Sequence, residues 1–287
     1  MSLRLPSGLG RIGPLSWMTG TVYPPRSFAA FEDFAVGNGD LFGLYWPIGL
    51  EDREPLVCEI FHDSWSIVPA FSYLDAFLKQ TGGLDEDGFP DAPSLEDDPH
   101  SPHACLTASR EAAAQGKVEE ACALAKRAIE YFPEHTAALA VLSAQCLRLG
   151  QHDEACRYAV RAVRSPPCFG DRTGLDRTWR WLSRQAQGPD DLAGDPIWLG
   201  RAALTAPPCG GTKQNDVYLA LAGAAEGYTA RGEVEAALSL WQAYAEFMSG
   251  ETVSFRERYG ITPEQHQQRQ RTLEARLPAG LREPDSQ

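Results

Sequence analysis

The chain has no apolar run approaching the roughly 18–20 residues that a membrane-spanning helix needs. Its first residues, MSLRLPSGLGRIGPLSWMTG, contain no continuous apolar stretch of the kind found in a secretory signal. The seven cysteines include no C-x-x-C pair and are odd in number, which argues against a zinc site and against a disulfide framework. We therefore expect a soluble cytoplasmic protein with reduced cysteines and no membrane contact.

Signatures of catalysis and of cofactor binding are absent as well. The sequence contains no G-x-x-x-x-G-K-[ST], G-x-G-x-x-G, G-x-S-x-G or H-E-x-x-H motif. His62 and Asp63 are adjacent, but consecutive strand residues point to opposite faces, so we expect a turn histidine and not a catalytic dyad. We predict that the protein is not an enzyme and binds no cofactor. An enzyme built from scattered carboxylates is the weakest alternative.

Positive charge is scarce in one part of the chain. The formal net charge is −13, and residues 1–103 carry 16 acidic against 5 basic residues, whereas residues 104–287 carry 23 against 21. An acidic surface repels nucleic acid, whose phosphates attract cations. We therefore predict a basic protein partner and no nucleic acid.

The second part of the chain contains an internal repeat. The segments GKVEEACALAKRAIEYFP and GQHDEACRYAVRAVRSPP align with a separation of 34 residues at every matched position. Glycine separates two helices, alanine allows close helix packing, and proline ends the second helix of each pair. The matched pairs are Gly116 and Gly150, Ala121 and Ala155, Ala128 and Ala162, and Pro133 and Pro167.

This punctuation predicts a series of helices. The two copies give helices over 104–115, 118–132, 136–149 and 152–164. A third copy begins at Gly232, with a partner helix over 216–231, and residues 170–206 are expected to form a divergent helical pair. In that pair Trp179 and Trp181 are two residues apart, so at most one of them faces the core squarely. Thr262, Pro263 and Gln265 predict a capping box at the start of the last helix.

The period and its residues resemble the tetratricopeptide repeat. The resemblance implies a helical solenoid with a concave groove that binds a partner. On the first helices, Leu106 and Arg110 would face that groove. The following helix carries Ala140 and Ala144 where chaperone-tail binders have polar or basic residues, so that partner is not expected. The alternative is that the helices only support the fold or dimerise.

The first part of the chain predicts a small antiparallel α+β module. Aromatic and apolar runs indicate strands over Leu41–Trp46, Leu56–Phe61 and Trp65–Val68, followed by a helix over Pro69–Lys79. The turn Asn38-Gly39-Asp40 before LFGLYW, the strand end at His62-Asp63, and the helix PAFSYLDAFL resemble the SUKH superfamily. Members of that superfamily include bacterial immunity proteins that neutralise toxins, which implies a toxin-binding role.

These observations divide the chain into three parts. We predict a SUKH-like α+β module over residues 1–81, an acidic proline-rich linker over 82–103, and a tetratricopeptide-like helical domain over 104–280. The linker contains acidic and histidine side chains that could ligate a metal, but a solvated acidic segment is the favoured interpretation. These side chains are Asp97, Asp98, His100 and His103.

The most specific functional prediction is an acidic, aromatic binding surface on the α+β module. Two tryptophans would anchor a basic partner within a rim of carboxylates, although tryptophans more often lie in a core. This surface comprises Trp46 and Trp65 with Glu51, Asp52, Glu54 and Asp63. The function expected is binding and occlusion of a basic toxin or nuclease. The alternative is a scaffold whose helical domain binds a peptide, unrelated to toxins.

Overall fold

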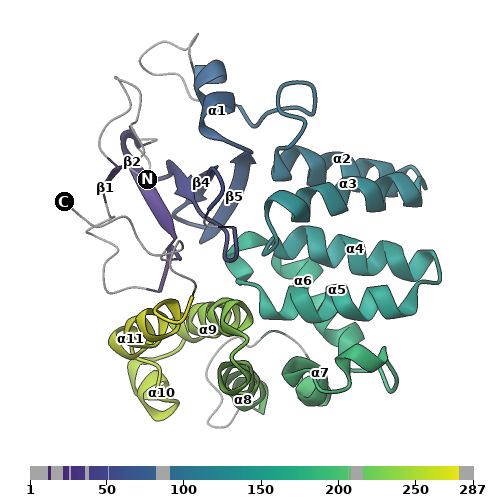
Figure 1. Ribbon diagram of the computed structural model, residues 1–287, viewed down its shortest axis with the longest axis vertical. Helices are drawn as coiled ribbons and strands as arrows, with labels where there is room; N and C mark the ends of the chain where they lie inside the picture. Colours follow the sequence, from purple (N-terminus) through teal and green to yellow (C-terminus); the bar gives the residue numbers. More distant parts are fainter. Residues whose placement is uncertain are drawn as a thin grey trace.

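The computed structural model describes residues 12–13, 22–25, 27–35, 39–50, 52–81, 91–205, 207 and 216–277. A β-sheet lies beside the ends of the helix pairs that form the rest of the molecule (Figure 1). This arrangement confirms an N-terminal α+β module followed by a helical region. Within the described residues, no helix combines the length and apolar character needed to cross a membrane.

The sheet is an antiparallel meander in which each strand pairs with the next. Alternate side chains enter two different cores, because successive residues of a strand point to opposite faces. On β4, Leu56, Cys58 and Ile60 face the helical region, whereas Val57 faces helix α1. The strands are β1 (Ile12–Gly13), β2 (Phe28–Ala35), β3 (Leu41–Tyr45), β4 (Leu56–Phe61) and β5 (Ser66–Phe71).

In this module one strand of the core sheet was missed and the helix was predicted to begin too early. Strand β2 was not predicted, and the helix predicted from Pro69 begins only at Leu74, because residues up to Phe71 continue strand β5. Val57 of β4 pairs with Phe71, and the register shifts between Val57 and Glu59. Proline has no amide hydrogen to donate, so Pro69 lies within the irregular part of this ladder.

The helices confirm the predicted punctuation. Gly116, Gly150 and Gly232 each separate two helices and adopt positive φ angles of 80°, 71° and 75°. The predicted capping box at Thr262 and Gln265 is present. The helices are α1 (Leu74–Thr81), α2 (Pro102–Ala114), α3 (Val118–Tyr131), α4 (Thr136–Arg148), α5 (His152–Arg164), α6 (Arg172–Leu182), α7 (Pro196–Gly200), α8 (Asp216–Arg231), α9 (Val234–Ser249), α10 (Val253–Arg258) and α11 (Pro263–Glu274).

The 34-residue spacing also appears in a hydrogen bond. Ser109 of α2 donates its hydroxyl to the carbonyl of Ala121 in α3 at 2.7 Å, and Ser143 of α4 donates to Ala155 in α5 at 3.0 Å. Both serines and both alanines are buried. A side-chain donor satisfied by a backbone carbonyl fixes how the two helices of each pair meet. The repeat therefore sets packing geometry as well as helix boundaries.

The sheet packs against the turns between successive helices. Tyr45 of β3 lies 5.4 Å from the ring of Phe132, after α3, and 5.1 Å from that of Phe169, after α5. Its hydroxyl donates to the buried carboxylate of Glu134 at 3.0 Å, and the amide of Ile48 donates to the same carboxylate oxygen at 2.7 Å. The two parts of the chain thus share one core.

The acidic segment before α2 is not a solvated linker over residues 91–101. Asp98 is 1% exposed and accepts hydrogen bonds from the amide and the hydroxyl of Ser72, each at 2.7 Å. It also accepts from the amide of His100. Ser101 caps α2 and donates to the carbonyl of Ala70 in β5. Composition did not predict these contacts, because it does not distinguish a buried, hydrogen-bonded aspartate from an exposed one.

We predict that Asp98→Ala lowers the free energy of unfolding by about 2–4 kcal/mol, because it leaves buried donors of Ser72 without their acceptor. The neighbouring Asp97 is exposed and accepts hydrogen bonds from the amide and hydroxyl of Ser94, so Asp97→Ala is the matched control, with an expected loss of about 0.5 kcal/mol. Urea unfolding monitored by circular dichroism measures both values. Equal losses in the two variants would contradict the anchoring role of Asp98.

Candidate functional site

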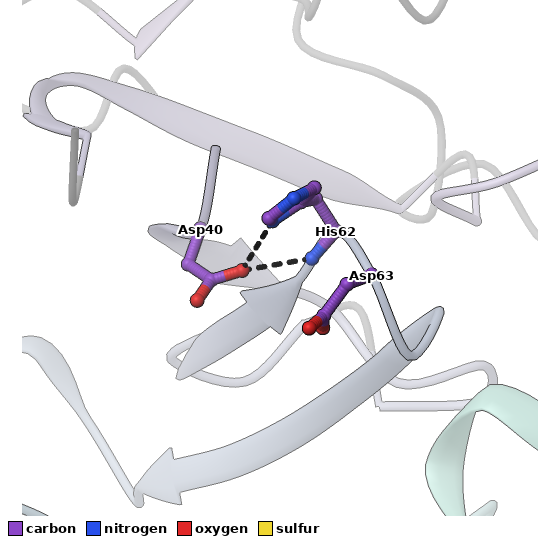
Figure 2. Close-up of side chains that lie close together, drawn as sticks. All are labelled: Asp40, His62 and Asp63. Atoms are coloured by element: carbon purple, nitrogen blue, oxygen red, sulfur yellow. Dashed lines mark hydrogen bonds and ion pairs between the residues drawn. The ribbon is translucent and has the colours of Figure 1, made fainter. Parts of the chain in front are cut away.

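One end of the sheet is organised by a buried aspartate. Asp40 precedes β3 and is 8% exposed. Its Oδ1 atom accepts hydrogen bonds from the backbone amide of His62 and from the imidazole Nδ1, both at 2.9 Å (Figure 2). His62 begins the turn between β4 and β5, as predicted. Asp40 therefore holds this turn at the start of β3.

The same turn presents a tryptophan to solvent. Trp65 is 50% exposed and has a φ angle of 52°, which a bulky residue rarely adopts. Its ring lies 5.2 Å from that of Tyr23, whose hydroxyl donates to the carbonyl of Ser66 at 2.9 Å. Trp65 is thus held on the surface by a buried aromatic neighbour.

Carboxyl groups lie at this turn and beneath it. Asp63 is exposed, and Asp40 lies beneath the turn. Burial, and secondly the nearby charge of Asp40, raise the pKa of Glu59 on β4 to about 7. At the surface of the turn, the exposed carboxylate of Asp63 is therefore two residues from the exposed ring of Trp65.

Asp40, His62 and Asp63 also have the chemistry of metal ligands. Within the described part of the chain, they are the group whose potential ligand atoms all lie within 4.8 Å of one another. Figure 2 shows Asp40 directed at His62, with the carboxylate of Asp63 alongside. In this geometry Asp40 stabilises the turn through the backbone and the imidazole of His62. The cluster is accounted for by that structural role.

The predicted binding surface is divided between the two ends of the sheet. Strand β3 separates Asp63 and Trp65 from the loop after it, about 13 Å away at 3.3 Å per residue. That loop carries Asp52 and Glu54, which are both exposed. Trp46 is half-buried and packs against the α1 side of the sheet, so it is a core residue. Glu51 lies outside the described residues.

A small hollow of about 200 Å³ lies at this second end of the sheet. It is lined by residues of the β3–β4 loop together with Tyr73 and Tyr131. Glu54 and Arg53 contribute charges of opposite sign to its rim. The charges on this rim therefore offset each other, whereas the exposed charge beside Trp65 is the carboxylate of Asp63.

The two predicted residues of the helical domain do not form a binding site. Leu106 is buried with Cys105 and Ala138 in the core between helices. Its prediction as a groove residue is wrong, because it lies on the inner side of α2. Arg110 is exposed and forms an ion pair with Asp171, the residue that caps α6, at 2.7 Å. That ion pair connects α2 with the start of α6.

Sequence reasoning missed a partly buried glutamate where the helical region meets the N-terminal segment. Glu246 of α9 accepts hydrogen bonds from the amide and thiol of Cys168 at 3.0 and 3.3 Å, and from the side-chain amide of Gln242 at 2.8 Å. The same amide of Gln242 donates to the carbonyl of Val22. Burial raises the pKa of Glu246 to about 7. No local sequence signal marks this residue, since Cys168 is 78 residues away in the chain.

The fold thus combines an α+β module with a helical region, and the module packs against the turns between helices. The turn between β4 and β5 displays the exposed side chain of Trp65.

Comparison with known proteins identifies the family. The model of the YfbP N-terminal domain matches residues 16–89, and that of the YfbP C-terminal domain matches residues 208–278. The chain is 35% identical to "Uncharacterized protein YfbP" of Escherichia coli (strain K12) over 239 residues, which is 83% of each chain. The protein belongs to the YfbP family.

This finding corrects the earlier resemblances. The suspected SUKH identification is wrong, and no tetratricopeptide family is found. The SUKH resemblance rested on short motifs. Two residues of these motifs, Asp40 and His62, form hydrogen bonds that stabilise the turn between β4 and β5. The 34-residue repeat lies between the two matched regions.

We predict that Glu246→Gln flattens the pH dependence of stability. The pKa of Glu246 is about 7 in the folded protein and near 4.5 in the unfolded chain, so its favourable contribution is present below pH 4.5 and is lost as the pH rises through 7. Glutamine stays neutral. The decrease in unfolding free energy from pH 5 to pH 8 should shrink by roughly 1–3 kcal/mol.

Urea titrations of both proteins at pH 5 and pH 8 measure this difference. Glu130→Gln, on an exposed position of α3, serves as the control and should leave the pH dependence unchanged. Parallel pH profiles for wild type and Glu246→Gln would show that the carboxylate of Glu246 does not titrate in the buried contact.

Proposed function

We propose that this protein is a non-catalytic binding protein that holds a basic protein partner against the turn from His62 to Trp65. The observation that carries the proposal is Trp65, a large aromatic side chain that is half exposed at a φ angle of 52°. A backbone conformation of this kind costs on the order of 1–3 kcal/mol, and such positions cluster at functional sites.

The surroundings of Trp65 support a binding role. Tryptophan is enriched among the residues that dominate protein interfaces, because its ring buries a large area. The contact with Tyr23 holds the ring in place before a partner arrives, which reduces the entropy lost on binding. Asp63 beside it favours a cationic partner and faster association.

We further propose that the helical region is a short solenoid that supports this surface. The helices α2 to α5 form two successive pairs, and the repeated bonds from Ser109 and Ser143 give both pairs the same internal geometry. Stacked pairs of this type form an extended scaffold whose units contact mainly their neighbours. A scaffold that binds a peptide is therefore the second candidate function.

A basic toxin or nuclease is one partner that the acidic turn would fit. That expectation came from the SUKH resemblance, so the proposal names only the chemistry of the partner, a cationic protein surface. We also propose a reducing, cytoplasmic location. The cysteines at 58, 105, 122, 146, 156 and 168 are free and buried, as expected where disulfides do not form.

We predict that Trp65→Ala weakens binding of the physiological partner at least tenfold, because it removes the aromatic anchor while leaving the sheet intact. The partner is first captured by placing a photo-crosslinking phenylalanine analogue at Ser64, next to Trp65, in the native host. The same analogue at Val253, an exposed apolar residue of α10, is the control position.

Affinity is then measured with purified proteins at low and high salt. The proposal expects a partner that crosslinks at position 64 and not at 253, binds more weakly at high salt, and loses affinity in Trp65→Ala and in Asp63→Lys. Identical crosslinks at both positions, or unchanged affinity in both variants, would remove this surface from consideration.

A further inference from the structure

Three exposed arginines lie along the second half of helix α6 and the turn that follows it. Arg177 and Arg180 are one turn apart on the same face of α6, and Arg184 lies in the turn after Leu182, the last residue of the helix. All three are exposed, whereas the opposite face of α6 buries Trp179 and Leu182. Arg177 and Arg180 are about 4.5 Å apart along the helix axis at 1.5 Å per residue.

This positive charge is largely uncompensated. Arg180 is 3.8 Å from Asp176, one turn earlier on α6. Within the part of the chain that the structure describes, Arg177 and Arg184 make no ion pair or side-chain hydrogen bond. The net charge of the chain is −13, so these arginines form a positively charged patch on an acidic protein.

A hollow follows these arginines. It has a volume of about 370 Å³ and lies between the start of α5 and the segment after α6. The imidazole of His152 donates to the side-chain carbonyl of Gln185 at 3.1 Å within it. Arg184 directly precedes Gln185, so the hollow begins next to the last of these arginines. The lining residues are His152, Asp153, Gln185, Ala186, Gln187 and Gly188.

A partly exposed aromatic side chain connects the two features. Trp181 packs with one edge against the core, and its ring lies 5.8 Å from that of His152. Its backbone carbonyl accepts a hydrogen bond from the side-chain amide of Gln185 at 2.7 Å. This surface therefore combines positive charge, the edge of an aromatic ring and a polar hollow.

We propose that the three arginines at the end of α6 and the hollow after them bind an acidic segment of a partner protein. Carboxylates of the segment would pair with Arg177, Arg180 and Arg184, and a neutral polar side chain would enter the hollow, because Asp153 disfavours a carboxylate there. Three cations on a strongly acidic protein match a short acidic peptide better than a polyanion such as nucleic acid, which the remaining surface repels.

This site does not depend on the proposed role of Trp65. The two surfaces have opposite charge and bind partners of opposite sign, so each can fail without the other. Their tests are also separate, since substitutions on α6 leave the turn from His62 to Trp65 unchanged.

The experiment uses the full chain and fluorescence anisotropy. The probes are a fluorescein-labelled 12-residue peptide with glutamates at every third and fourth position and glutamine elsewhere, the same peptide with lysine in place of glutamate, and a labelled single-stranded 20-nucleotide DNA. Wild type is compared with Arg177→Glu/Arg180→Glu/Arg184→Glu. The control, Lys79→Glu/Lys126→Glu/Arg271→Glu, makes the same charge change at exposed positions on α1, α3 and α11.

The proposal expects the acidic peptide to bind wild type, to bind the α6 variant at least tenfold more weakly, and to bind the control variant within threefold of wild type. A separate Ala186→Trp substitution in the wild-type chain, which fills the hollow without changing the charge, should also weaken binding. The proposal is overturned if wild type does not bind the acidic peptide, if both triple variants lose affinity equally, or if the DNA binds more tightly than the peptide through the same arginines.

Discussion

The structure depends on the packing of one sheet face against the turns between helices. Tyr45 is the centre of this contact, because its ring meets Phe132 and Phe169 while its hydroxyl reaches Glu134. A buried carboxylate is costly unless donors surround it, and here the donors come from β3 and the loop after it. The helical region therefore supplies the acceptor, and the sheet supplies the hydrogens that make burial of that acceptor tolerable.

The candidate binding surfaces follow from this packing. With one face of the sheet covered by helices and the other by α1, the turn from β4 to β5 is a place where the module still meets solvent. Asp40 fixes that turn and Trp65 is exposed on it. On the helical side, Trp179 fills the core, so Trp181 and the arginines of α6 face outward. The two proposed surfaces thus arise from core packing beneath them.

The helices could be predicted because their signals are local. Glycine with positive φ, alanine at close contacts and the capping box at Thr262 each act within a few residues of the chain. The anchoring of Asp98 and the contacts of Glu246 could not be predicted, since each depends on residues brought together by the fold. For the same reason the predicted surface was divided: Trp46 and Trp65 flank neighbouring strands, but antiparallel pairing places them at opposite ends. Only the turn residues Asp63 and Trp65 survive as a candidate site.

The attachment of the sheet to two successive turns has a mechanical consequence. An array of helix pairs that contact only their neighbours can bend along its length, and its end pairs can unfold one at a time. Here a single rigid sheet contacts Phe132 after the first pair and Phe169 after the second. The sheet therefore fixes the angle between the two helix pairs, so that one pair cannot separate from the sheet without disturbing the other.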